Sequence, residues 1–435
     1  MRVSGRLRLR DVVSNGRVAA ALTLGFASGL PFNLSQGTLQ AWLATLDVDL
    51  KTIGWLTLVG VPYTFKFLWA PLLDRFVPPF LGRRRGWIVL FQAAIAVTTA
   101  ALGLTAARDA IYALASLALL LAFLSASQDV VIDAYRTDTL RAPERGIGST
   151  ATQLGWRIAT LISGALALVL SGFVGWRVTY LLMALLMAAT VLLTFCAPEP
   201  ERQVLPPRTL RAAVVEPLGE LLGRPGAIAL LGLVVLYKFG DAFALSLSTA
   251  FLIKGVGFTA AQVGAVAKTT GIIATIAGTL LGGLVYVRLG LYRALLGFGV
   301  LQAATNLLYS WLALAGRDLE VMVIAVGFDN LAGGMGAAAF GAFLMALCDS
   351  RFSAFQFALL SALSALARSF LGPLAGALVE GAHVSSTLFG VPLISLELPA
   401  LGWARFFVLT FSCALPGLLL LVWLRKRIAA LDGPR

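Results

Sequence analysis

Runs of about 20 consecutive apolar residues recur along the whole chain and limit what it can fold into. A helix rises about 1.5 Å per residue, so a run of this length crosses the ~30 Å hydrocarbon core of a bilayer. The sequence predicts twelve such spans, near residues 17–46, 51–71, 87–106, 110–137, 146–171, 176–196, 227–253, 259–287, 292–313, 319–348, 353–380 and 401–424.

The backbone of these runs must satisfy its own polar groups, because lipid offers no hydrogen bonds. Only helices and closed barrels do so, and the runs are too long and continuous for barrel strands. With 59% hydrophobic and 13% charged residues, the 435-residue chain also has too little charge for a water-soluble surface. The sequence therefore predicts an all-α polytopic membrane protein.

The net charge of +13 is distributed unevenly among the loops. Arginines lie before the first span and after every even-numbered span, including the loop between spans six and seven. The alternate loops have few cations. Basic loops stay in the cytoplasm, so we expect both termini to be cytoplasmic and the first span to remain uncleaved. The basic charge reflects topology and does not indicate nucleic-acid binding.

The sequence has no pattern typical of an enzyme. Cys196, Cys348 and Cys413 lie far apart, in spans or at their ends, which predicts neither a disulfide framework nor a metal site. No nucleophile accompanies the lone His383. We expect no cofactor, with a proton gradient as the source of energy.

The chain contains two similar halves on either side of residues 197–226, which are rich in proline and charge. Residue pairs 211 apart in the two halves are Gly29 and Gly240, Asp138 and Asp349, and Arg157 and Arg368. The shared offset indicates an internal repeat. We expect an N-terminal six-helix bundle over 1–196, a cytoplasmic loop over 197–226 and a C-terminal six-helix bundle over 227–435.

Two parallel six-span repeats joined by a cytoplasmic loop resemble the major facilitator superfamily. The resemblance implies two bundles related by a pseudo-two-fold axis along the membrane normal, with substrate bound midway between them and alternating access by rocking. The loop after span two is similar to the signature loop of this superfamily, although an insertion around Pro78 and Pro79 lengthens it. It implies a cytoplasmic latch of acids and arginines: Asp74, Arg75, Arg83, Asp138 and Asp349.

Several ionisable side chains lie inside the spans, where burying a charge in lipid costs free energy. Such side chains either serve the function of the protein or form ion pairs that hold helices together. Lys238 and Asp241 lie one helical turn apart near the expected midplane. The offset of 211 gives Ala27 and Leu30 as their counterparts, so these charges are additions to the duplicated scaffold.

Polar and charged groups of the spans are our candidates for substrate binding. They are Gln36, Gln40, Tyr63, Lys66, Gln128, Asp129, Arg157, Lys238, Asp241, Lys268, Asn330 and Arg368. Arg157 and Arg368 occupy matching positions in the two halves. Each is therefore either a ligand contact or a helix-packing residue.

Four carboxylates of the spans are candidates for proton coupling, since burial favours the neutral acid. They are Asp129, Asp133, Asp241 and Asp329. Asp129 and Asp133 are one turn apart on one helix face. Protonation of any of the four makes the cation-rich interior more positive, which predicts an anionic substrate. The residue that carries the proton stays open, because coupled carboxylates titrate as a group.

Longer motifs resemble the AmpG-type muropeptide permeases of Gram-negative bacteria. They cover both halves and include GTLQAWL (37–43), KFLWAPLLDR (66–75), GRRRGW (82–87), SQDVVIDAYRTD (127–138), YKFGDAF (237–243), FLIKGVGF (251–258), KTTGIIATIAG (268–278), FDNLAGGMG (328–336) and FSAFQFALLSALSALARSFLGPLAG (352–376). Two departures from the family are the long outer segment 383–403 and the short C-terminus.

The resemblance implies proton-driven import of N-acetylglucosaminyl-1,6-anhydro-N-acetylmuramyl peptides from periplasm to cytoplasm. These fragments feed peptidoglycan recycling and, in some species, β-lactamase induction, in a multi-pass protein of the inner membrane. We expect a monomer that contacts lipid, protons and an anionic anhydromuropeptide. Two alternatives remain: a transporter of another organic anion, such as an acyl-nucleotide or a siderophore, and a membrane enzyme or sensor.

Overall fold

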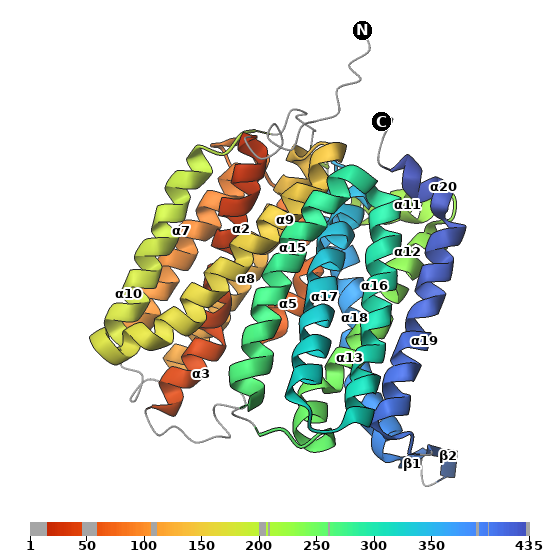
Figure 1. Cartoon of the computed structure of the whole chain (residues 1–435). Coiled ribbons are helices and arrows are strands. Elements are labelled where there is room, and N and C mark those ends of the chain that lie inside the picture. The colour runs from red at the N-terminus through yellow and green to blue at the C-terminus, as the bar shows by residue number, and fades with distance from the viewer. Residues whose placement is uncertain are drawn as a thin grey trace. The chain divides into compact units, whose positions relative to one another are not determined.

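The computed structural model describes residues 15–45, 59–105, 111–199, 206–207, 209–259, 262–388, 391–398 and 400–431, and almost all of them are helical (Figure 1). The twelve predicted spans fall largely on helix where the structure describes them. Nine of the described helical stretches are long and apolar enough to cross a membrane.

The described chain forms two compact units. The first runs to Arg224 and also contains Gly341–Ala362, and the second comprises Pro225–Phe340 and the chain from Leu363 onward. The boundary after Arg224 lies inside the predicted inter-bundle loop. The segment 341–362 lies within the predicted C-terminal bundle, yet it packs with the first unit.

The first unit is built from the N-terminal helices. Its helices and helical turns are α2 (Gly16–Ser35), α3 (Gly37–Ala44), α5 (Val61–Phe65), η2 (Lys66–Leu68), α6 (Ala70–Arg75), α7 (Gly82–Leu104), α8 (Ile111–Thr139), η3 (Ala142–Glu144), α9 (Arg145–Leu161), η4 (Ile162–Leu166), α10 (Ala167–Phe195) and α11 (Leu210–Gly223).

The second unit contains most of the later elements. They are α12 (Ala227–Leu236), α13 (Phe239–Ala250), η5 (Phe251–Gly255), η6 (Val263–Lys268), α15 (Thr269–Leu289), α16 (Leu291–Ala315), α17 (Leu319–Leu347), α18 (Ser353–Glu380), β1 (Ala382–Leu388), β2 (Val391–Leu398), α19 (Gly402–Trp423) and α20 (Arg425–Ala430). The end of α17 and the start of α18 belong to the first unit.

Non-helical residues interrupt predicted spans one and seven and separate spans five and six. Gln36 (φ −128°, ψ −98°) separates α2 from α3, and Lys238 (φ −100°, ψ 0°) separates α12 from α13. Gly175, with φ 77°, marks the turn inside α10 where predicted span five gives way to span six. A broken helix leaves backbone groups without intrahelical partners, which membrane proteins tolerate where other protein groups or water satisfy them. Two of the breaks, at Gln36 and Lys238, fall on predicted site residues.

Close helix packing in the first unit depends on Gly25 and Gly29 of α2, four residues apart. A Cβ on Gly29 would lie 2.6 Å from the backbone oxygen of Trp156, and one on Gly25 would overlap the backbone of Thr152, both on α9. Small residues at this spacing let two membrane helices approach until their backbones touch.

The second unit uses the same device between α15 and α17. A Cβ on Gly282 would lie 2.6 Å from the Cα of Met335, and one on Gly278 would overlap the backbone oxygen of Leu331. Lipid gives no hydrophobic drive for helix association, so this close contact is a main source of cohesion.

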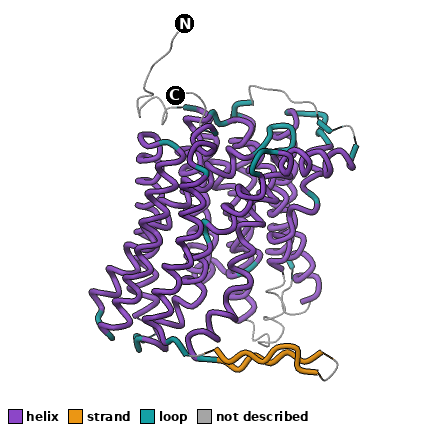
Figure 2. Tube along the Cα trace, turned by 90° about the vertical axis from the view of Figure 1, so that its right-hand side faces the viewer, coloured by secondary structure: helices purple, strands orange, loops and turns teal. Residues whose placement is uncertain are grey.

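The long outer segment forms an antiparallel hairpin of β1 and β2, drawn in orange in Figure 2. Its register pairs Ala382 with Leu398 and Leu388 with Val391, and it shifts between Ser386 and Thr387. The hairpin accounts for the length of the segment between the last two spans, which departs from the family pattern.

Replacing Gly282 with alanine tests the helix contact. The added methyl group must push α15 and α17 apart, and overpacking of this kind costs about 1–3 kcal/mol. We expect the melting temperature of the detergent-purified protein to fall by several degrees.

Gly297→Ala is the matched control, because a Cβ on this helical glycine of the same unit meets nothing within 4 Å. Equal melting temperatures for the two variants would contradict the contact.

Candidate functional site

Lys66 lies between two carboxylates of α8 in the first unit. Its ammonium contacts Asp129 and lies 3.5 Å from the carboxylate of Asp133. Asp129 also accepts a hydrogen bond of 2.7 Å from Ser28. The predicted shared face of Asp129 and Asp133 is confirmed, because one ammonium reaches both.

A second cation completes this charge cluster. The guanidinium of Arg136 lies 2.7 Å from Asp133 and 4.7 Å from the ring centre of Phe357. Two cations and two acids thus share a buried region with no net charge. A fully paired cluster is the arrangement that low-dielectric surroundings require.

Aromatic rings lie on the neighbouring helices of the first unit. The ring centre of Phe32 lies 5.3 Å from that of Tyr63 and 5.6 Å from that of Trp156. Tyr63 donates a hydrogen bond of 2.8 Å to Ser125. Arg157 stacks 5.4 Å from the ring centre of Trp156 and is exposed, and none of the described carboxylates pairs with it.

Three glutamines of the first unit are candidates for substrate contact. Gln36 stands at the break between α2 and α3, and Gln40 lies in α3 beyond it, both partly buried. Gln128 is fully buried beside Asp129 in sequence, and neither atom of its amide has a hydrogen-bond partner in the described structure.

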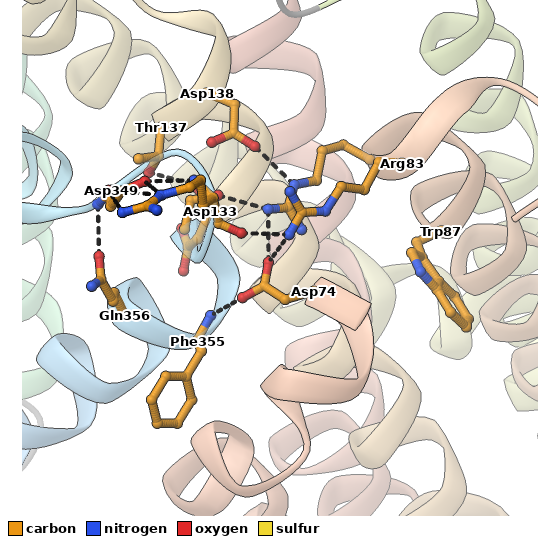
Figure 3. Close-up of polar contacts among 12 residues, drawn as sticks. Asp74, Arg83, Trp87, Asp133, Thr137, Asp138, Asp349, Phe355 and Gln356 are labelled. Carbon is orange, nitrogen blue, oxygen red and sulfur yellow. Dashed lines mark hydrogen bonds and ion pairs between the residues drawn. The ribbon is translucent and has the colours of Figure 1, made fainter. Parts of the chain in front are cut away.

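The predicted latch is built around the fully buried Asp74 (Figure 3). Its carboxylate receives Arg83 and Arg84 at 2.8 Å each and the backbone N–H of Phe355 at 2.9 Å. Arg84 also reaches Asp138 at 2.8 Å. These bonds join α6, α7 and α8 to the start of α18, all within the first unit.

Two other predicted latch residues have different partners. Asp349 binds Arg351, at 2.9 Å, while Arg75 lies 5.6 Å from the ring centre of Phe76. Burial opposes the ionisation of Asp349, but side-chain and backbone hydrogen bonds from Arg351 hold its pKa below the usual value. Burial and the adjacent cation Arg84 lower the pKa of Arg83 to about 10, against the opposing effect of Asp74, so Arg83 stays charged at neutral pH.

The linker helix α11 is tied to the same region by Gln356. Its amide donates to Glu220 (2.7 Å) and to the Pro217 carbonyl (3.2 Å), and its oxygen accepts from the Asp349 N–H (2.6 Å). The start of α18 is therefore held from two sides, by Asp74 and by α11.

The second unit has its own charge cluster at the break between α12 and α13. The ammonium of Lys238 lies 3.7 Å from Asp241 and 3.2 Å from the side-chain oxygen of Gln302 on α16. A separation of 3.7 Å is longer than a hydrogen bond, so this pair is electrostatic rather than bonded.

Asp329 of α17 lies in the same cluster and is 4% exposed. Its two oxygens accept hydrogen bonds from Thr305 (3.1 Å) and Tyr309 (3.2 Å) of α16. The charges of Asp241 and Asp329 repel each other here. The structure thus brings together three of the predicted residues, Lys238, Asp241 and Asp329.

The remaining candidates of the second unit are placed differently. Asn330 accepts a hydrogen bond from Thr275 of α15 (3.1 Å) and donates one to the Val326 carbonyl of its own helix (2.9 Å), so its one described contact with another helix joins α17 to α15. Lys268 ends the turn η6 and Arg368 lies in α18, and their side chains are outside the described residues.

Sequence reasoning missed the neutral partners of the charged groups. They are Ser28, Gln302, Thr305, Tyr309, Ser353 and Gln356. The one available signal was the spacing of Gln302, Thr305 and Tyr309, which places three polar groups on one face of an apolar helix.

The family model of the Major Facilitator Superfamily matches residues 21–373. The chain belongs to that superfamily. It is therefore a membrane transporter rather than a membrane enzyme. Two solved members share the fold at low identity: FucP in the outward conformation (TM-score 0.67, 12% identity, 94% of this chain and 99% of that one) and a XylE double mutant (0.66, 12%, 96% of each).

Curated relatives place the chain more narrowly within the superfamily. The Anhydromuropeptide permease of Escherichia coli K12 is 50% identical over 413 residues, which cover 95% of this chain and 80% of that protein. The putative transporter AmpG 4 of Rickettsia conorii is 29% identical over 97% of this chain and 100% of its own length. The predicted AmpG-type family is confirmed, as is the predicted fold class.

Removing Lys66 tests the buried charge cluster. Lys66→Ala leaves Asp129 and Asp133 with Arg136 as their one remaining cation, and breaking a buried pair costs about 3–5 kcal/mol. We expect a large drop in melting temperature, and Lys66→Ala with Asp129→Asn should recover much of it because the unpaired charge is gone.

Lys254→Ala, at an exposed lysine of η5, serves as the control with no expected effect. A double variant no more stable than Lys66→Ala alone would show that the ion pair is not what the fold depends on.

Proposed function

We propose that this transporter imports N-acetylglucosaminyl-1,6-anhydro-N-acetylmuramyl peptides from periplasm to cytoplasm, coupled to protons, for peptidoglycan recycling. We place it in the inner membrane of a Gram-negative bacterium, as a monomer with both termini in the cytoplasm. The observation that carries the proposal is the 50% identity over 95% of the chain to the E. coli protein named Anhydromuropeptide permease.

The charge chemistry of the spans supports this substrate. Anhydromuropeptides have carboxylates that cationic side chains can bind and sugar hydroxyls that amide side chains can bind. Arg157 has no described carboxylate partner, and the Lys238 ammonium lies too far from Asp241 for a hydrogen bond. Both therefore have donors to offer to a carboxylate of the substrate.

The latch supports transport by alternating access. It fastens the start of α18 to the helices of the first unit through Asp74 and Arg84. In our proposal these bonds open and close in each cycle, so Asp74 and its arginines govern conformational change and the midplane groups govern binding.

Whole-cell uptake of radiolabelled anhydromuropeptide tests the proposal. We expect uptake by cells that produce the protein, and its loss when a protonophore collapses the gradient. Lys238→Ala and Asp129→Asn should each reduce uptake at least tenfold at unchanged protein level, because each removes a charge of the binding or coupling groups.

The exposed Lys254→Ala variant is the control and should transport normally. Absence of proton-dependent uptake by the wild type would refute the substrate assignment. It would favour another organic anion, such as an acyl-nucleotide or a siderophore, which the same assay can test with labelled compounds.

A further inference from the structure

We propose that Asp329 is the carboxyl group that takes up the coupled proton, and that Thr305 and Tyr309 hold it in both protonation states. The inference rests on the proposed proton-coupled import. It narrows four candidate acids to one and gives roles to two hydroxyl groups of α16.

The partners of Asp329 set it apart from the other candidate acids. It is 4% exposed, and the hydrogen bonds it receives from described side chains come from neutral hydroxyls. A buried carboxylate without a bonded cation is costly when ionised, so it is the group most ready to bind a proton. Each of the other acids has a cation within 4.0 Å: Lys66 for Asp129, Arg136 for Asp133, and Lys238 for Asp241.

Hydroxyl partners suit a group that changes its protonation state. A hydroxyl both donates and accepts, whereas an ammonium or guanidinium group only donates. The Thr305 hydroxyl has two acceptors in reach, the Asp329 carboxylate at 3.1 Å and the Gln302 backbone oxygen at 2.7 Å, and one hydrogen to give. When Asp329 is protonated, that hydrogen turns to Gln302 and the threonine oxygen accepts from the new acid proton.

The charged groups that act on Asp329 are those of the Lys238 cluster. Asp241 of α13 repels its charge and Lys238 attracts it, while α16 contributes the Tyr309 and Thr305 hydroxyls. The side chains of Lys268 and Arg368 are outside the described residues.

Protonation of Asp329 removes one of the two negative charges near Lys238. The ammonium then keeps Asp241 as its one acidic neighbour among the described groups, at a distance too long for a hydrogen bond. Its positive charge becomes more available to a carboxylate of the substrate. Proton uptake by Asp329 thus favours binding of the anion, so the proton binds before the substrate.

Purified protein in proteoliposomes provides the test, with two readouts for labelled anhydromuropeptide. Asp329→Asn imitates the neutral acid in shape and charge. We expect this variant to keep exchange of labelled for unlabelled substrate, within about threefold of wild type, and to lose accumulation driven by an inward proton gradient. Accumulation at the wild-type level would overturn the proposal, as would loss of exchange in a correctly folded variant.

Tyr309→Phe gives an independent measurement that keeps the ring, which stacks 5.1 Å from Phe407. It removes a hydroxyl that favours the ionised carboxylate, so the proton binds at lower proton concentration. We expect the midpoint of the pH profile of uptake to move to higher pH.

The matched control is Tyr237→Phe, whose lost hydroxyl donates to the Leu295 backbone, and its midpoint should not move. An unmoved midpoint in Tyr309→Phe would overturn the role of this hydroxyl and of the site. Wild-type protein without any anhydromuropeptide transport would instead refute the proposed function itself, and this inference with it.

Discussion

An ionised side chain inside a membrane span is stable only beside an opposite charge, a set of hydrogen-bond donors or water, and this constraint organises the whole structure. In the first unit it produces a closed cluster in which Lys66 and Arg136 neutralise Asp129 and Asp133. In the second it produces a looser arrangement, because Lys238 and Asp241 stand 3.7 Å apart and Asp329 has hydroxyl partners. The loosely paired groups of the second unit are therefore more available to a proton or a ligand than the tightly paired groups of the first.

Where the helices break and where they touch also follow from the membrane environment. Lys238 occupies the non-helical residue between α12 and α13, so its position is fixed by the ends of two short helices instead of one continuous span. Glycines such as Gly29 and Gly282 bring helix backbones into contact. At the helix ends, Asp74 ties the start of α18 to α7 through Arg84 and the Phe355 N–H.

Much of the fold follows from the sequence, because a lipid environment leaves few choices. The apolar runs predict the spans, and the spacing of Asp129 and Asp133 predicts that they share one helix face. The partners themselves depend on tertiary packing. Nothing in the spacing of Thr305 reveals that its hydroxyl reaches Asp329, nor that Asp349 pairs with Arg351 rather than with the latch. The β1–β2 hairpin was also missed, since the outer segment has no repeat counterpart to compare with.

Proton movement with the substrate is the central claim, and intravesicular pH measures it most directly. Proteoliposomes without an initial pH gradient receive anhydromuropeptide on the outside while a trapped dye reports the internal pH. We expect the interior to acidify as substrate enters, and empty liposomes to show no change. Substrate entry without acidification would contradict proton coupling and the role of the buried carboxylates in it.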